Sequence, residues 1–281
     1  GGCEVQKVFS NFRTYRSFVE FTTRTISTDR VRSMYRSNLG EWSAAFLQCN
    51  PGKMPCLKYS DEKFMLLLRK RLSMRQPCVD VIRQATCICG AVGVNEEHCY
   101  KCYTEGGKNE CHAAAQLAIL GAQKHAGISS TAEDRNLVES DGQRRHADTT
   151  GHRVKLDNSR YNKFGTDVTV VSPILSTAAS MRYCGAAAKK AEATKRSSGD
   201  TEKNLNDAGI AYYPLAIECN GALGKQMLPF IKKLSEVAFV RRSHDKAYYK
   251  HWWSMVIANT IHQSVAETIL SKAKSVLSIQ S

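Results

Sequence analysis

The feature that most constrains this chain is a cluster of cysteines and one histidine between residues 87 and 102. Cys87-Ile88-Cys89-Gly90 is followed by His98 and Cys102, which gives the spacing C-x-C-x8-H-x3-C. Two short ligand pairs joined by a small loop can supply the four tetrahedral ligands that Zn²⁺ prefers. Such a segment has no core of its own, so bound zinc would fold it directly. We therefore predict a structural zinc site formed by Cys87, Cys89, His98 and Cys102.

Two alternatives stay open at this point. Cys99 could replace Cys102 as the fourth ligand, or the cluster could be a group of buried free thiols with a surface histidine. The chain has 11 cysteines, an odd number, and the clustered spacing indicates metal ligation rather than a disulfide framework. We therefore expect a reducing compartment, nuclear or cytoplasmic.

The charge of the chain indicates a polyanionic partner. It carries 40 Lys and Arg against 26 Asp and Glu, a formal net charge of +14. Such an excess favours nucleic acid, although a generally basic protein would show the same balance. No run of 18 apolar residues is present, so we expect no membrane-spanning helix.

The order of predicted elements indicates the fold class. Ser60 is a candidate N-cap of a helix with Asp61 and Glu62 in its first turn. Residues 129–165 are polar and predict a loop-rich segment. The other predicted elements are helices over 110–124, 177–196, 225–239 and 245–277, and strands over 166–171 and 211–218. Strands alternating with helices indicate an α/β (α+β) unit, a small mixed sheet flanked by helices.

Acidic residues and lysines form a second candidate site. Metal-dependent phosphodiester cleavage needs carboxylates to hold the ion and a cation to orient water or stabilise developing charge. Asp148 and Asp167 precede and open the Val-rich strand, and Lys189, Lys190 and Lys195 lie on the following helix. Glu133 is a further candidate acid. Asp167 could instead form a structural ion pair, and Glu218 could be structural, holding the turn that follows it.

Seven parts of the chain follow one another in an order and spacing typical of one family. They are Glu41–Leu47 with Leu57–Phe64 and Arg71-Leu72, the segment from Cys87 to Cys102, Glu110–Ala113, Arg145-His146-Ala147-Asp148, Thr166–Pro173, Ala191–Lys195 and Tyr213–Gly221. Together they resemble the C-terminal zinc-knuckle plus restriction-like (PD-(D/E)XK) endonuclease region of non-LTR retrotransposon reverse-transcriptase-like proteins. The resemblance covers about residues 40 to 270.

The resemblance implies a restriction-endonuclease-like fold with a helical N-terminal part and a zinc knuckle. It implies that Asp148 and Asp167 bind catalytic Mg²⁺, and that Lys195 is a migrated catalytic lysine because Thr169 stands at the usual lysine position. In such proteins the endonuclease nicks target DNA.

Further expectations concern partners. We predict that Arg144, Arg145 and His112 contact nucleic acid, which is DNA or, alternatively, RNA. An upstream reverse-transcriptase domain in a longer protein is a further expected partner. The predicted division is a basic helical region over 1–84, a zinc knuckle over 85–110, the nuclease core over 111–240 and a C-terminal helix over 241–281.

Three residues or segments depart from the family pattern. His146 replaces a proline, Cys111 replaces a basic residue before His112, and no tyrosine closely follows Lys195. The alternative hypotheses are therefore a non-catalytic zinc-containing nucleic-acid-binding module and an inactive retroelement relic.

Overall fold

The structure, a computed structural model, describes residues 37–38, 40–48, 58–72, 74–93, 95–102, 104, 107–140, 143–156, 161–173, 185–198 and 201–280. Most of the predicted basic N-terminal region, including residues 1–36, lies outside the described residues.

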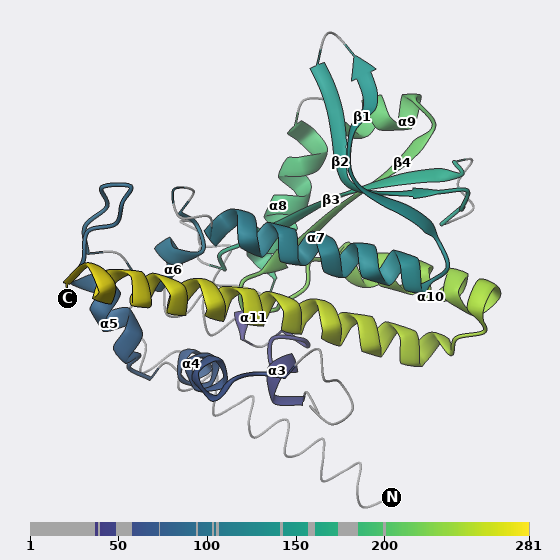
Figure 1. Ribbon diagram of the computed structural model, residues 1–281. Coiled ribbons are helices and arrows are strands. Elements are labelled where there is room, and N and C mark those ends of the chain that lie inside the picture. The colour runs from purple at the N-terminus through teal and green to yellow at the C-terminus, as the bar shows by residue number, and fades with distance from the viewer. Residues whose placement is uncertain are drawn as a thin grey trace, which may run out of the picture.

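A four-stranded open sheet forms the centre of the described fold (Figure 1). Its order is β1 (Ser129–Ser140), β2 (Gln143–His152), β3 (Lys163–Val171) and β4 (Ile210–Glu218). The first three strands are antiparallel neighbours, whereas β4 pairs with β3 in parallel. The predicted small mixed sheet flanked by helices is therefore confirmed.

Helices cover the sheet and extend away from it. They are α3 (Ala45–Gln48), α4 (Asp61–Arg71), α5 (Pro77–Arg83), α6 (Glu96–Cys99), α7 (Gly107–His125), α8 (Ala186–Ser197), α9 (Thr201–Asp207), α10 (Met227–Arg242) and α11 (Lys246–Gln280). Figure 1 shows the long α11 running beside α7, with α10 folding back along it. None of the described helices is long and apolar enough to cross a membrane.

The alternation of side chains along β3 and β4 separates two apolar layers. Phe164 and Val168 belong to the main core, together with residues of α7, α10 and α11. Tyr212 lies in a smaller cluster with Leu205 of α9. Because successive strand residues point to opposite faces, Asp167 lies on the face away from the main core, beside α8 and α9.

The predicted loop over 129–165 is wrong, because β1 and β2 form a hairpin there. Ser140 pairs with Gln143, so only the dipeptide Asp141-Gly142 connects the two strands. Asp-Gly is a strong hairpin signal. The strands lack an alternating apolar pattern, and this polarity led to the loop prediction. In the folded chain Thr149 of β2 is buried beside Thr166 of β3: their hydroxyl oxygens lie 2.6 Å apart, and Gln123 donates to Thr149.

Other predicted elements are confirmed. The Ser60 hydroxyl accepts a hydrogen bond from the Lys63 amide, as expected of an N-cap. The predicted strand over 211–218 is β4, and Pro214 stands on this edge strand, where its missing N–H is tolerated. The helix predicted over 177–196 is described from Ala186 onward as α8, and its expected start lies outside the described residues.

Candidate functional site

The four residues of the predicted zinc site converge. The ligand atoms of Cys87, Cys89, His98 and Cys102 all lie within 4.8 Å of one another. The Cys87 and Cys102 sulfurs are 3.7 Å apart, and the Cys89 sulfur lies 3.4 Å from His98 Nε2. Three sulfurs and one imidazole nitrogen form a donor set that suits a tetrahedral ion. This Cys/His cluster could hold a metal ion.

Local backbone structure sets the positions of these ligands. The Cys87 amide donates to the Ala91 carbonyl at 2.8 Å, which closes a tight loop around Cys89. Gly90 supports the loop with a φ of 85°, a conformation that glycine adopts at low cost. On the other side, the Asn95 side chain caps α6 by accepting from the His98 amide at 3.2 Å.

Cys102, rather than Cys99, completes the cluster. The Cys102 amide donates to the His98 carbonyl at 2.8 Å, which keeps the two ligands on one turn of backbone. Cys99 is buried, and its sulfur lies 3.7 Å from the Asn95 carbonyl oxygen. Sequence spacing left both cysteines open, and the turn geometry separates them.

A buried lysine from the C-terminal helix completes the surroundings of the cluster. Lys272 of α11 is 6% exposed, and its ammonium group donates to the Cys87 sulfur at 3.2 Å. Burial acts to raise the pKa of Cys87, but hydrogen bonds from the Cys89 backbone, His98 and Lys272 lower it to about 6. Such a thiol is readily deprotonated, and the resulting thiolate is the form that binds metal.

Two aspartates face each other on adjacent strands. Thr149 pairs with Thr166 in the antiparallel β2–β3 ladder, so Asp148 and Asp167, the next residues outward, come opposite one another. The Asp148 carboxylate accepts a hydrogen bond from the Val168 amide at 2.6 Å. The charge of Asp148 acts to raise the pKa of Asp167, and a hydrogen bond with Asp167 acts to lower the pKa of Asp148. The hairpin and β3 thus bring together two acids that lie 19 positions apart in the sequence.

Lys195 and Tyr212 complete the Asp167 side of this acidic site. The Lys195 ammonium lies 2.7 Å from Asp167 Oδ1, and the Tyr212 hydroxyl donates to Oδ2 at 3.1 Å. Burial raises the pKa of Asp167, and Lys195 partly offsets this effect. Burial and the neighbouring Asp167 carboxylate raise the pKa of Tyr212, so its hydroxyl acts as a donor.

His112 completes the Asp148 side. Its Nε2 atom lies 3.1 Å from Asp148 Oδ2, and Gln116, one turn further along α7, donates to the Asp148 carbonyl at 2.7 Å. The hydrogen bond with Asp148 raises the pKa of His112. Burial acts to raise the pKa of Asp148, but the His112 and Val168 hydrogen bonds lower it. His112, predicted as a nucleic-acid contact, therefore lies within the acidic site.

Three further residues were predicted for the site: Glu133, Arg144 and Arg145. Glu133 lies on β1 with an exposed side chain and a φ of 49°, between Ala132, which pairs with Thr149, and Asp134, which pairs with Ala147. Its role as a third acid stays a prediction. Arg144 and Arg145 lie in β2, but their side chains are outside the described part of the chain.

The sequence reasoning missed Tyr212. Its signal was present in β4: Tyr212 and Tyr213 are adjacent in a strand, so one ring must face each side of the sheet. Tyr213 packs against Phe164 and Phe230 in the main core, which leaves Tyr212 on the face that carries Asp167.

Glu218 anchors the helix that carries Lys195. Helix α8 begins after Gly185 without a side-chain cap of its own. The buried Glu218 carboxylate accepts from the amides of Ala187 at 3.0 Å and Ala188 at 3.4 Å, and from the Ser37 hydroxyl. Glu218 is therefore structural, although it caps α8 rather than only holding the turn after it.

We expect Glu218→Ala to lower the free energy of unfolding by about 1–3 kcal/mol, because two helix amides lose their buried acceptor. Urea unfolding followed by circular dichroism measures the change. Glu218→Gln retains one acceptor oxygen and is expected to lose less. Equal stability of Glu218→Ala and the unchanged protein would show that the carboxylate does not anchor α8.

No protein-family model matches this sequence, and no curated protein is significantly similar to it.

Proposed function

We propose that this chain is a metal-dependent DNA endonuclease domain that nicks its target, with a restriction-endonuclease-like core and a structural zinc knuckle. The observation that carries the proposal is the meeting of Asp148, Asp167 and Lys195 at one place, from two adjacent strands and a helix. The order of these three residues along the chain also agrees with the family resemblance of the sequence.

The donor sets fit two different metals. The Cys/His cluster offers soft sulfur and imidazole ligands that suit zinc. The acidic site offers hard carboxylate oxygens from Asp148 and Asp167. Mg²⁺ in proteins is commonly held by one or two carboxylates together with substrate phosphates, so a pair of aspartates is sufficient for it.

The residues of the acidic site would divide the chemistry among them. Bound Mg²⁺ would supply positive charge for the scissile phosphate and for activation of water. Asp148 and Asp167 would hold it. Lys195, with its ammonium 2.7 Å from Asp167, orients the attacking water or neutralises charge that develops on the phosphate. His112 and Tyr212 hold the two carboxylates in position by hydrogen bonds.

Space for a substrate group adjoins this site. A hollow of about 430 Å³ lies between the end of β3 and α8, and Lys195 and Lys190 are among its lining residues. Thr169 and Val171 of β3 line the opposite side. A phosphate placed there would lie next to the Lys195 ammonium group, as cleavage requires.

One observation favours a second candidate function. Asp167 already has Lys195 and Tyr212 as partners, and Asp148 has His112 and the Val168 amide. A carboxylate pair satisfied by protein groups also fits a structural network in a nucleic-acid-binding module that does not cleave.

Nicking of supercoiled plasmid by the purified chain tests the proposal. We expect conversion to the open circular form in Mg²⁺ or Mn²⁺ and none in Ca²⁺, whose looser coordination supports this chemistry poorly. Substituting Ca²⁺ keeps the zinc in place, whereas a chelator would remove both metals. A folded, zinc-loaded, DNA-binding protein that does not nick in Mg²⁺ or Mn²⁺ would favour the non-catalytic module.

A further inference from the structure

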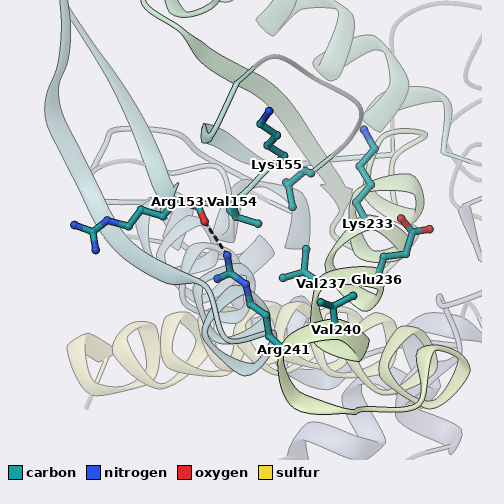
Figure 2. A pocket seen from close by; sticks show the side chains of 9 residues that line it. Arg153, Val154, Lys155, Lys233, Glu236, Val237, Val240 and Arg241 are labelled. Carbon is teal, nitrogen blue, oxygen red and sulfur yellow. Dashed lines mark hydrogen bonds between the residues drawn. The ribbon is translucent and has the colours of Figure 1, made fainter.

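A pocket of about 570 Å³ lies between the segment that follows β2 and helix α10, outside both sites described above. Figure 2 shows Lys155 and Lys233 on opposite sides in the upper part of the view, with Val237, Val240 and Arg241 below them. Three of the four basic residues that line the pocket, Lys155, Lys233 and Arg241, thus surround a partly apolar floor. The single acidic residue among the lining side chains is Glu236.

The cations of this pocket are held in different ways. Arg241 donates to the carbonyls of Gly127 at 2.9 Å and Arg153 at 2.7 Å, which ties α10 to the ends of α7 and β2. Lys233 donates to the Tyr213 hydroxyl at 3.4 Å and lies over its ring, with the ammonium 4.7 Å from the ring centroid. Two of the three positive charges are therefore positioned before any ligand arrives, which lowers the entropic cost of binding.

Lys155 has no partner among the residues that the structure describes, and it is exposed. Its neighbours Val154 and Leu156 are buried and fix the backbone on either side of it. The preceding residue, Arg153, has a φ of 55°, a left-handed conformation that costs a non-glycine residue about 1 kcal/mol or more. Figure 2 shows that the Arg153 side chain points away from the pocket while its carbonyl faces Arg241. This turn presents Lys155 across from Lys233.

We propose that this pocket binds the phosphodiester backbone of nucleic acid at a second position, away from the acidic site. Lys155, Lys233 and Arg241 supply the positive charges for phosphates, and the valines accommodate the apolar side of the sugar. The net charge of +14 makes a polyanion the complementary partner. The inference rests on the proposed function for the identity of the ligand, but it concerns binding and not cleavage.

The pocket and the acidic site are separate positions on the fold. Arg153 follows Asp148 by five residues, and a strand rises about 3.3 Å per residue, so the separation along β2 is roughly 17 Å. The pocket lies against α10 on the core side of the sheet, whereas Asp167 lies on the side of α8 and α9. The pocket would therefore contact a different part of a bound nucleic acid from the acidic site.

The salt dependence of DNA binding tests this inference. The full chain is titrated, by fluorescence anisotropy without added Mg²⁺, onto labelled 24-base-pair duplex and single-stranded DNA at several KCl concentrations. The variant is K155M/K233M, because methionine keeps the apolar stems and removes both charges. The matched control is K232M/K250M, which removes two exposed charges outside the pocket.

Each lost phosphate contact reduces the slope of log affinity against log salt by about 0.9 for duplex DNA. We expect K155M/K233M to reduce the slope by nearly twice this amount, and we expect the control variant to leave the slope close to that of the original chain. An unchanged slope in K155M/K233M, or an equal loss in both variants, would overturn the proposal. So would loss of binding to phosphatidylserine vesicles with DNA binding intact, which would assign the pocket to a lipid headgroup.

The salt-dependence test and the nicking test can fail independently of each other. A chain that fails to nick but shows the pocket-dependent slope rejects only the endonuclease. A chain that nicks with an unchanged slope in K155M/K233M rejects only the pocket. Equal melting temperatures of the variants and the original chain exclude unfolding as the cause of either result.

Discussion

Asp167→Asn is expected to reduce Mg²⁺-dependent nicking at least about 100-fold, because removal of one carboxylate charge removes a metal ligand and its electrostatic support. Asparagine has nearly the same shape, and its amide oxygen can still accept from Tyr212, which lies 3.1 Å from Asp167 Oδ2. The loss would therefore report on charge and metal binding rather than on packing. Asp148→Asn is expected to have a similar effect. The measurement is the rate of plasmid nicking under single-turnover conditions.

A control with the same chemical change separates this effect from a general change in charge. Asp207→Asn removes one carboxylate from the exposed end of α9, and we expect nearly unchanged nicking. DNA binding by Asp167→Asn should persist, because the phosphate contacts are supplied by other residues. Nicking at the original rate by Asp167→Asn would show that the acidic pair is structural and that any observed nuclease lies elsewhere.

Cys102→Ser is expected to abolish stoichiometric zinc binding, whereas Cys99→Ser is expected to retain it. The reason is geometric: Cys102 lies within 4.8 Å of the other ligand atoms, and the Cys99 sulfur lies by the Asn95 carbonyl instead. Loss of the ion would remove the bonds that join the two ligand pairs, and only the packing of residues such as Tyr100 would then hold the loop. Zinc content measured by mass spectrometry, one ion per chain at the start, reports the outcome directly.

Amide hydrogen exchange should show which segments lose protection when zinc is lost. In Cys102→Ser we expect faster exchange over residues 86–102 and near Lys272, which joins α11 to Cys87. Cys87 and Cys102 belong to the same apolar core as Phe164. The sheet should nevertheless keep its protection, because its strands are held by their own hydrogen-bond ladders. Loss of zinc in Cys99→Ser together with retention of zinc in Cys102→Ser would show that Cys99, and not Cys102, is the fourth ligand.

The Cys/His cluster shows how far sequence spacing reaches. Spacing predicted Cys87, Cys89 and His98 as a group, because ligands close in sequence are necessarily close in space. It predicted Cys102 as the fourth ligand but left Cys99 as an alternative, since both closely follow His98. That choice depends on the backbone after α6, where the Cys102 amide bonds to the His98 carbonyl. Spacing could not predict the contact of Lys272 with Cys87, because the two residues are 185 positions apart.

The acidic site shows a different limit. Asp167 was readable as the acid that opens a Val-rich strand, and the family resemblance singled out Asp148 and Lys195. The hairpin strand β2, which carries Asp148, was not predicted, because β1 and β2 are polar. It pairs with β3 through backbone hydrogen bonds and the Thr149–Thr166 contact, and this pairing brings Asp148 beside Asp167. Tyr212 was missed for a different reason. The adjacent tyrosines of β4 indicate one ring on each face of the sheet, but the partner Asp167 comes from β3, and pairing with a distant strand cannot be read from the sequence around Tyr212.

The proposed nuclease requires Asp148 and Asp167 to hold a divalent metal ion together. Anomalous diffraction from crystals soaked in Mn²⁺, collected near the manganese edge, would locate that ion. We expect a single Mn²⁺ peak within coordination distance of carboxylate oxygens from both aspartates, with the Lys195 ammonium group nearby and a separate zinc peak at the Cys/His cluster. A zinc peak without Mn²⁺ between the aspartates, in crystals where the Lys195–Asp167 ion pair is unchanged, would contradict the claim.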